Sequence, residues 1–314
     1  MRGQISPAEA QAVLRLASAA AAADGVGPLS DQTVLHVRHG GGPGARNLLL
    51  WRGGDLAGFA HLGAAADPAA ARSGELVVHP AHRRQGLGRM LVRAVTAEAG
   101  GHPVRLWAHG DLPAAAALAA GAGLTRARAL WRMSRSLRLP LAEPRLATGI
   151  SVRTFVPGRD EPEWVELNGR AFADHPEQGR WTIQDIAERE HEPWFDPAGF
   201  FLAERDGRMT GFHWTKIHPV GPAPAHGPVG EVYVIGIDPA EQGSGLGRAL
   251  TLIGLRYLRD RGLDEVMLYV EESNPAAIRL YESLGFARAG TDVMYGSGLT
   301  RPTSPRAPRP APRG

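Results

Sequence analysis

The 314-residue chain contains no cysteine. This absence excludes disulfide bonds, thiolate metal ligands and cysteine nucleophiles, and it fits a reducing compartment, so we expect the cytoplasm. The sequence also has no run of about 18 apolar residues, the length that a membrane-spanning helix needs. The first residues lack a basic stretch followed by an apolar one. We therefore expect neither a membrane association nor a secretory signal.

Lysine is almost absent, because Lys216 is the only one among 35 basic residues. The formal net charge is +3, and removing the four arginines of the tail leaves −1 for the rest of the chain. A basic face for nucleic acid is therefore not indicated. The tail itself, residues 301–314, is rich in proline and arginine and is predicted to be disordered. Its arginines are Arg301, Arg306, Arg309 and Arg313.

The most informative feature that is present is an internal repeat. The segment Glu75–Leu91 reads ELVVHPAHRRQGLGRML, and Val234–Leu250 reads VIGIDPAEQGSGLGRAL. Pro80 matches Pro239 at a spacing of 159 residues, and the glycines that follow keep the same spacing. A repeat of this length indicates two copies of one domain.

Each copy has the same predicted order of elements. A hairpin comes first, with a Gly53-Gly54-Asp55 turn in one copy and an Asp206-Gly207 turn in the other. A third strand, a helix, a strand, a short helix and a last strand follow. This order predicts an α/β fold with two tandem domains, each a mixed central β-sheet flanked by helices. The predicted boundaries are 1–136, a linker over 137–149, a second domain over 150–300, and the tail.

A glycine motif stands between the third strand and the helix of each copy. It reads Arg83-x-x-Gly86-x-Gly88 in the first and Gln242-x-x-Gly245-x-Gly247 in the second. Glycines allow a tight turn and close approach of a ligand. The loop amides and the helix N-terminus can then hold a pyrophosphate. One such pattern could be an ordinary turn, but two copies in the same context favour anion binding.

This arrangement resembles the GCN5-related N-acetyltransferase (GNAT) superfamily. The resemblance implies acetyl-CoA as co-substrate, with its pyrophosphate on the loop and its thioester against the amides of a strand, here Val232–Ile237, that separates from its neighbour. It also implies an asparagine and a tyrosine on the later short helix. His213 and His218 share a strand region but lack metal-ligand spacing, so we expect no metal. The cofactor-binding residues expected from the resemblance are Val77, Val78, His79, Gln85, Gly86, Leu87, Gly88, Arg89, Met90, Ile235, Gly236, Ile237, Gln242, Gly243, Ser244, Gly245, Leu246, Gly247, Arg248, Asn274, Pro275, Ala276, Ala277, Ile278 and Arg279.

Direct acetyl transfer to an amine needs a base, donors for the oxyanion and an acid for the departing thiolate. Glu231, at the start of the strand beside the thioester, is the predicted base, and Tyr281 is the predicted acid. Either alone could be structural, a charged strand end or a half-buried aromatic, but their joint placement around one loop favours catalysis. Aligned on the shared prolines and glycines, the first copy has Arg72, Ala119 and Leu112 opposite Glu231, Tyr281 and Asn274. We therefore expect the first copy to be a degraded, non-catalytic domain.

The second half carries more specific strings, namely Ala171–Thr182, Phe212–Pro219, Gly230–Pro239 and Leu268–Glu271. With the tandem layout, they are similar to the mycothiol synthases of actinobacteria. This resemblance implies acetylation of the cysteinyl amine of cysteinyl-glucosaminyl-inositol, the last step of mycothiol biosynthesis. It also gives the single lysine a role in substrate binding. The substrate-binding residues expected from it are Asp31, Glu177, Lys216, Glu231 and Tyr269.

Two other functions are open at this stage. One is acetylation of another amine, such as a protein N-terminus, a polyamine or an antibiotic. The other is a non-catalytic acetyl-CoA sensor, which a tandem fold with one degraded copy could provide. We expect a monomer, because an internal duplication can replace a dimer of single domains.

Overall fold

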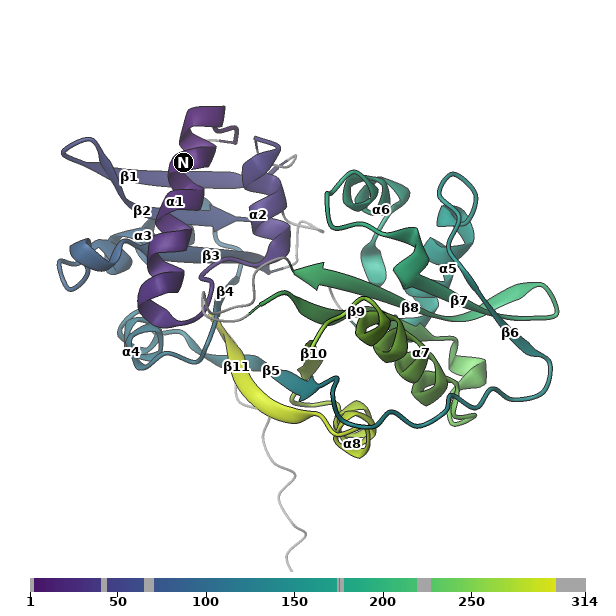
Figure 1. Cartoon of the computed structure of the whole chain (residues 1–314). Coiled ribbons are helices and arrows are strands. Elements are labelled where there is room, and N and C mark those ends of the chain that lie inside the picture. Colours follow the sequence, from purple (N-terminus) through teal and green to yellow (C-terminus); the bar gives the residue numbers. More distant parts are fainter. Residues whose placement is uncertain are drawn as a thin grey trace, which may run out of the picture. The chain divides into compact units, whose positions relative to one another are not determined.

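The computed structural model describes residues 3–40, 44–64, 71–173, 175, 178–218 and 227–297. The chain forms two compact units (Figure 1). Unit 1 comprises Met1–Ala129 and Asp292–Gly314, and unit 2 comprises Leu130–Thr291. Glu177 and the tail 301–314, both named in the sequence predictions, lie outside the described residues.

In unit 1, strands β1, β2 and β3 pair antiparallel, β3 pairs parallel with β4, and β4 pairs antiparallel with β11. Helices α1 and α2 cover one sheet face, where Phe59 and Val77 are buried. Helix α3 covers the other, where Leu91 and Val95 are buried. The elements are α1 (Pro7–Asp24), α2 (Asp31–Arg38), β1 (Arg46–Arg52), β2 (Asp55–Leu62), β3 (Arg72–Val78), α3 (Leu87–Glu98), β4 (Val104–Ala108) and α4 (Pro113–Gly121).

Unit 2 repeats this plan. Strands β6 to β9 pair antiparallel in chain order, β9 pairs parallel with β10, and β10 pairs antiparallel with β5. One sheet face is packed by aromatic residues, with Trp164 and Trp214 fully buried, and the other by α7 and α8. The elements are β5 (Thr125–Ser136), β6 (Ile150–Thr154), α5 (Glu161–Ala171), α6 (Ile183–Glu190), β7 (Phe200–Arg205), β8 (Arg208–His218), β9 (Val229–Ile237), α7 (Leu246–Asp260), β10 (Glu265–Glu271), α8 (Pro275–Ser283) and β11 (Ala287–Gly296).

The last strand of each copy contributes to the other copy's unit. Residues Leu130–Ser136 of β5 pair with β10 in unit 2, although they belong to the first copy in sequence. Val293–Gly296 of β11 pair with β4 in unit 1, although they follow the second copy. The compact units therefore do not follow chain order at these two strands, so neither copy completes its sheet from its own sequence.

Local sequence accounts for most element boundaries. Ser6 and Glu9 form a reciprocal capping box at the start of α1. The β7–β8 hairpin turns at Asp206 and Gly207, which adopt φ values of 52° and 75°, as a two-residue turn of this kind requires. Among the described residues, no helix combines the length and apolar character needed to cross a membrane.

One helix glycine is required by close packing. A Cβ at Gly254 of α7 would lie 2.1 Å from Cε1 of His213, whose ring is buried and whose Nδ1 lies 2.8 Å from the Leu250 carbonyl oxygen. Burial lowers the pKa of His213 to about 4, so the ring is neutral. We expect Gly254→Ala to reduce the free energy of unfolding by about 1–3 kcal/mol in urea denaturation, because the core must shift. Gly121→Ala, with no atom within 4 Å of the new Cβ, is the control and should be nearly neutral. Equal stability of both variants would contradict this packing argument.

Candidate active site

The site of unit 2 is built where β9 and β10 part. Their parallel pairing joins Gly230–Val232 to Val266–Leu268, while both strands run on beyond it. At the same place the β8–β9 register shifts, since Trp214 pairs with Val234 and Thr215 with Val232, which leaves Tyr233 as a bulge. The predicted separation of this strand from its neighbour is confirmed. Backbone amides beyond the parting are thus available to a ligand.

Glu231 lies two residues before the bulge and is only 6% exposed. Its Oε2 is 2.7 Å from Nε2 of His218, the last residue of β8. Directly across the β8–β9 ladder stands Lys216, which is also buried. The Lys216 ammonium lies 4.5 Å from the Trp194 ring centroid and 5.2 Å from that of Tyr233, a cation–π arrangement that stabilises a partly desolvated charge. Two of the predicted site residues, Glu231 and Lys216, are therefore brought together.

Tyr281 is buried in the core of unit 2. It belongs to the core cluster that contains Val232 and Leu268, the last pair of the β9–β10 ladder, and its ring lies edge-on to Phe286 at 5.8 Å. Burial raises the pKa of Tyr281 to about 12, so the hydroxyl carries its proton at neutral pH. A protonated hydroxyl in this position can act as an acid.

Asn274, the other expected residue of the short helix, is the N-cap of α8. Its side-chain oxygen accepts a hydrogen bond from the Ala277 amide at 3.1 Å. In the first copy Leu112 takes the same place before α4 and makes no side-chain cap. Asn274 therefore has a structural role in α8 whether or not it also contacts a ligand.

The glycine loop of unit 2 leads into α7. Gly243 and Gly245 adopt φ values of 80° and 86°, a left-handed conformation that favours glycine. Gly245 is the N-cap of α7 and provides no side-chain cap. The loop borders a cavity of about 570 Å³ that is also lined by Arg248 and by residues of the 137–149 linker. Amides at a helix N-terminus, together with arginine, suit phosphate oxygens.

The first copy has the same loop conformation. Arg84 and Gly86 adopt φ values of 62° and 84°, as Gly243 and Gly245 do 159 residues later. Arg83, however, already makes hydrogen bonds within unit 1. Its guanidinium contacts both carboxylate oxygens of Asp24 at 2.7 Å, and its Nε donates to the Val78 carbonyl.

Comparisons with known proteins show the family. A model of the acetyltransferase (GNAT) family matches residues 163–286, and a model of the acetyltransferase (GNAT) domain matches residues 43–121. The mycothiol acetyltransferase of Thermobispora bispora is 63% identical over 92% of this chain and 96% of its own length. The mycothiol acetyltransferase of Thermomonospora curvata is 59% identical over 91% and 92%. The chain belongs to the mycothiol acetyltransferase family. It is an acetyl-CoA-dependent N-acetyltransferase with two GNAT domains.

Solved structures share the tandem fold of this family member. A GCN5-related N-acetyltransferase from Sphaerobacter thermophilus matches with a TM-score of 0.69 and 27% identity over 94% of each chain. A tandem GNAT protein from the clavulanic acid biosynthesis pathway matches with a TM-score of 0.71 and 20% identity, over 95% of this chain and 99% of its own. At such identity the second likeness concerns the fold alone. The predicted fold class is therefore confirmed.

The strand register corrects one sequence alignment within this GNAT pair. Counting back from the shared proline places Arg72 opposite Glu231. In the structure Glu231 of β9 pairs with Met267 of β10. The residue at the corresponding place in unit 1 is Ser73 of β3, which pairs with Arg105 of β4. The β9 bulge at Tyr233 has no counterpart in the regular β2–β3 ladder, so the alignment slips by one residue upstream of it. Neither a serine hydroxyl nor a protonated arginine can take up a proton at neutral pH, so the first copy lacks a base at this place with either alignment.

A charged side-chain ladder occupies the corresponding strands of unit 1. Glu75 of β3 lies 3.2 Å from His109 Nε2, and His109 Nδ1 lies 2.8 Å from Asp292 of β11. Burial opposes a charge on the His109 ring, but the hydrogen bonds to Asp292 and Glu75 outweigh it and raise its pKa to about 10. Burial likewise opposes charge on Glu75, yet His109 and the Ser30 amide keep its pKa below the ordinary value. Glu75, His109 and Asp292 thus form a buried ion pair network in unit 1.

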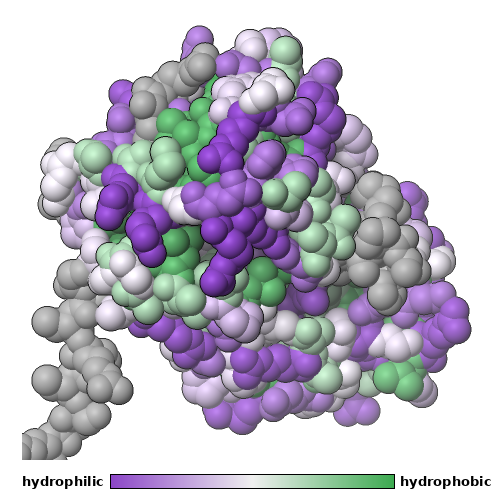
Figure 2. Space-filling view, turned by 90° about the vertical axis from the view of Figure 1, so that its left-hand side faces the viewer, coloured by the Kyte–Doolittle hydropathy of each residue, from purple (hydrophilic) through white to green (hydrophobic). Residues whose placement is uncertain are grey.

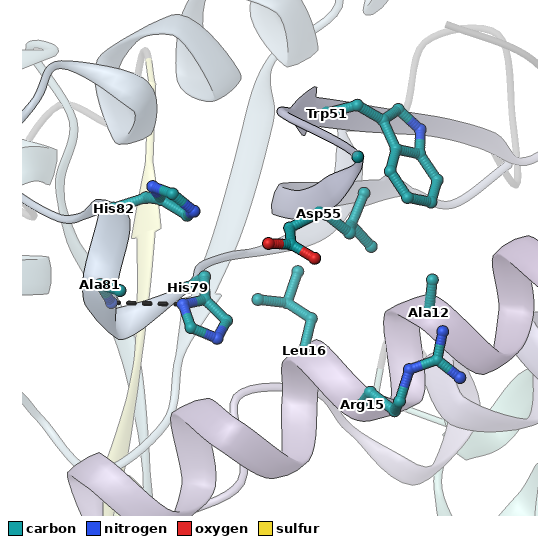
Figure 3. A pocket seen from close by; sticks show the side chains of 10 residues that line it. Ala12, Arg15, Leu16, Trp51, Asp55, His79, Ala81 and His82 are labelled. Atoms are coloured by element: carbon teal, nitrogen blue, oxygen red, sulfur yellow. Dashed lines mark hydrogen bonds between the residues drawn. The ribbon is translucent and has the colours of Figure 1, made fainter.

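Unit 1 also has a cavity of about 460 Å³ beside α1 (Figure 3). Arg15, Trp51 and Asp55 line it, together with His79, whose Nδ1 accepts a hydrogen bond from the Ala81 amide at 3.2 Å. It contains neither a counterpart of Glu231 nor one of Tyr281. On the face shown in Figure 2, hydrophilic residues prevail among those in colour, and apolar residues form small separate areas.

Of the other predicted substrate residues, the structure describes Tyr269 in unit 2 and Asp31 in unit 1. Tyr269 of β10 is 41% exposed and pairs across the ladder with Arg132. Asp31 is the exposed first residue of α2 in unit 1, and Glu177 is outside the described residues. The sequence analysis did not identify His218 as a site residue. The signal was its even spacing from Lys216 on one strand, which places both side chains on one sheet face.

Proposed function

We propose that this enzyme transfers the acetyl group of acetyl-CoA to the cysteinyl amine of cysteinyl-glucosaminyl-inositol, the last step of mycothiol biosynthesis. The observation that carries the proposal is the buried Glu231 carboxylate at the parting of β9 and β10, paired with His218 and opposite the single lysine. The names of the family members, mycothiol acetyltransferases, support the choice of acceptor.

The proposed mechanism is direct transfer. Glu231 removes a proton from the acceptor ammonium, and the free amine attacks the thioester carbonyl carbon. Backbone amides of β9 beyond the bulge stabilise the oxyanion. The intermediate collapses with cleavage of the carbon–sulfur bond, and the Tyr281 hydroxyl protonates the leaving thiolate. The nitrogen, which became positively charged on attack, gives its second proton to the Tyr281 phenolate through solvent, and Glu231 releases the first proton to solvent. The products are the N-acetyl amide, CoA and one proton, so charge and atoms balance.

In this proposal, His218 positions the Glu231 carboxylate and Lys216 binds the acceptor. The 2.7 Å contact with His218 holds one Glu231 oxygen in place and leaves the other for the ammonium. The Lys216 ammonium, above Trp194 and Tyr233, is a donor for carbonyl or hydroxyl oxygens of the acceptor. Tyr269, Glu177 and Asp31 remain proposed substrate contacts.

The direct test is incubation of the purified protein with acetyl-CoA and cysteinyl-glucosaminyl-inositol. We expect one acetyl group on the product, stable to hydroxylamine, because an amide resists hydroxylamine whereas a thioester on the cysteine sulfur does not. A panel of polyamines, aminoglycosides and peptides with free N-termini serves as the comparison. Preferred acetylation of any of these would replace the proposed acceptor, and absence of turnover with every amine would favour a sensor role.

Tyr281→Phe tests the acid. We expect kcat to fall about 100-fold with little change in KM, because the variant loses only the proton supplied to the thiolate. Tyr257→Phe is the matched control. Tyr257 also has a raised pKa, but its hydroxyl is bound to Asp196 at 2.6 Å, so its loss should leave kcat within twofold. Wild-type kcat in Tyr281→Phe would show that the thiolate leaves without this hydroxyl.

A further inference from the structure

The linker between the two copies is fixed to unit 2. The strap, defined here as Leu139–Arg145, contains no helix or strand, yet two arginines bind its backbone. Arg135 of β5 donates to the carbonyls of Leu139 and Pro140 at 3.4 Å. Arg256 of α7 donates to the carbonyls of Leu141 and Ala142. These bonds hold an irregular segment in one path across the helix.

The strap continues into the cavity beside the glycine loop. Ala142, Glu143 and Arg145 of the strap line this cavity together with Ser244, Gly245 and Arg248. Glu143, the only carboxylate among the lining residues, is paired with Arg256 at 2.6 Å. Its charge is therefore compensated and does not oppose an anion in the cavity.

We propose that Arg145 is a cofactor-binding residue, which places its guanidinium on a phosphate of CoA at the adenosine end. The inference rests on the proposed use of the α7 loop for the CoA pyrophosphate. CoA carries a diphosphate and a 3′-phosphate, and the loop amides account for the diphosphate alone. The exposed arginine that lines the same cavity supplies the two-pronged donor that phosphate oxygens favour. The linker is thus a wall of the site.

Calorimetric titration with acetyl-CoA in the absence of any amine tests this proposal. We expect Arg145→Gln to raise the Kd of the α7 site about tenfold, the effect of losing one charge-assisted hydrogen bond. Arg138→Gln is the matched control, because Arg138 belongs to the same linker but pairs with Asp264 instead of lining the cavity. Arg256→Gln, which frees the strap, should also raise the Kd.

The 3′-dephospho analogue of acetyl-CoA identifies the phosphate. If the Arg145→Gln effect disappears with the analogue, Arg145 binds the 3′-phosphate, and if it persists, Arg145 binds the diphosphate. The proposal would be overturned if every Kd that the titration resolves for Arg145→Gln lies within twofold of the wild-type value. Because the titration contains no amine, that result would say nothing about which amine accepts the acetyl group. Conversely, if the proposed acceptor is wrong, the Kd values for acetyl-CoA do not change.

Discussion

Glu231→Gln is expected to lower kcat by about 10²- to 10⁴-fold at neutral pH, the range for loss of a general base. Glutamine keeps the shape of the side chain and an acceptor oxygen for His218 Nε2, so the hydrogen bond of 2.7 Å can persist. What is lost is the ability to take a proton from the acceptor ammonium. The measurement is steady-state release of CoA at saturating acetyl-CoA.

Two controls sharpen this experiment. Glu282→Gln removes a carboxylate from the exposed face of α8, in the same unit, and should leave kcat within twofold. Raising the pH should partly restore the rate of Glu231→Gln, because more of the acceptor amine is then already deprotonated. A variant with wild-type kcat, or with no gain at high pH, would argue against Glu231 as the base.

His109→Gln is expected to reduce the free energy of unfolding by about 3–5 kcal/mol, the cost of breaking a buried ion pair by removing one partner. The variant leaves Glu75 and Asp292 buried without their cation. Because Asp292 lies on β11 and Glu75 on β3, the loss also weakens the attachment of the C-terminal strand to unit 1. Urea unfolding followed by circular dichroism measures the change, and His102→Gln, in the turn before β4, is the control. Equal stability of the two variants would mean that the ladder contributes little.

The same ladder predicts a pH dependence of stability. The pKa of His109 is about 10 in the folded chain against an ordinary 6.5, so its stabilisation is complete below about pH 6.5 and is lost as the pH rises towards 10. The pKa of Glu75 is lowered, so its stabilisation is present above its ordinary pKa and is lost in acid. The difference in unfolding free energy between the wild type and His109→Gln should therefore shrink from pH 6.5 to pH 10. A difference that is constant across this range would contradict the assignment of charge to His109.

The secondary structure and the loops could be predicted because they depend on local chemistry. The turn at Asp206-Gly207 and the two glycine loops need left-handed backbone, which Gly207, Gly86 and Gly245 adopt without strain, so these glycines indicate the conformation. Asp206 and Arg84 adopt it as well, which the sequence pattern does not indicate. Ala119 holds the same position in α4 as Tyr281 in α8, and Leu112 and Asn274 are the N-caps of these two helices, as the alignment predicted. The comparison of the two copies was therefore sound wherever the backbones are alike.

The alignment failed at Arg72 because the bulge at Tyr233 is a property of strand pairing. A bulge adds one residue to one strand relative to its partner. A bulged strand and a regular strand both have the sequence pattern of an extended apolar segment, so the sequence does not distinguish them. The contact between His218 and Glu231 was missed for the same reason. The two residues lie 13 positions apart, and only the register of β8 on β9 places them together.

The sequence by itself determined the family and the left-handed glycine loops, and it predicted a base and an acid in one copy and their loss from the other. Glycine dihedral freedom and side-chain acidity are properties of single residues, so they can be read without coordinates. Only the tertiary structure decided which unit each last strand completes, that the linker is a fixed strap, and that a ladder of Glu75, His109 and Asp292 spans unit 1. Those outcomes depend on pairing between segments up to nearly 200 residues apart, which no local pattern encodes.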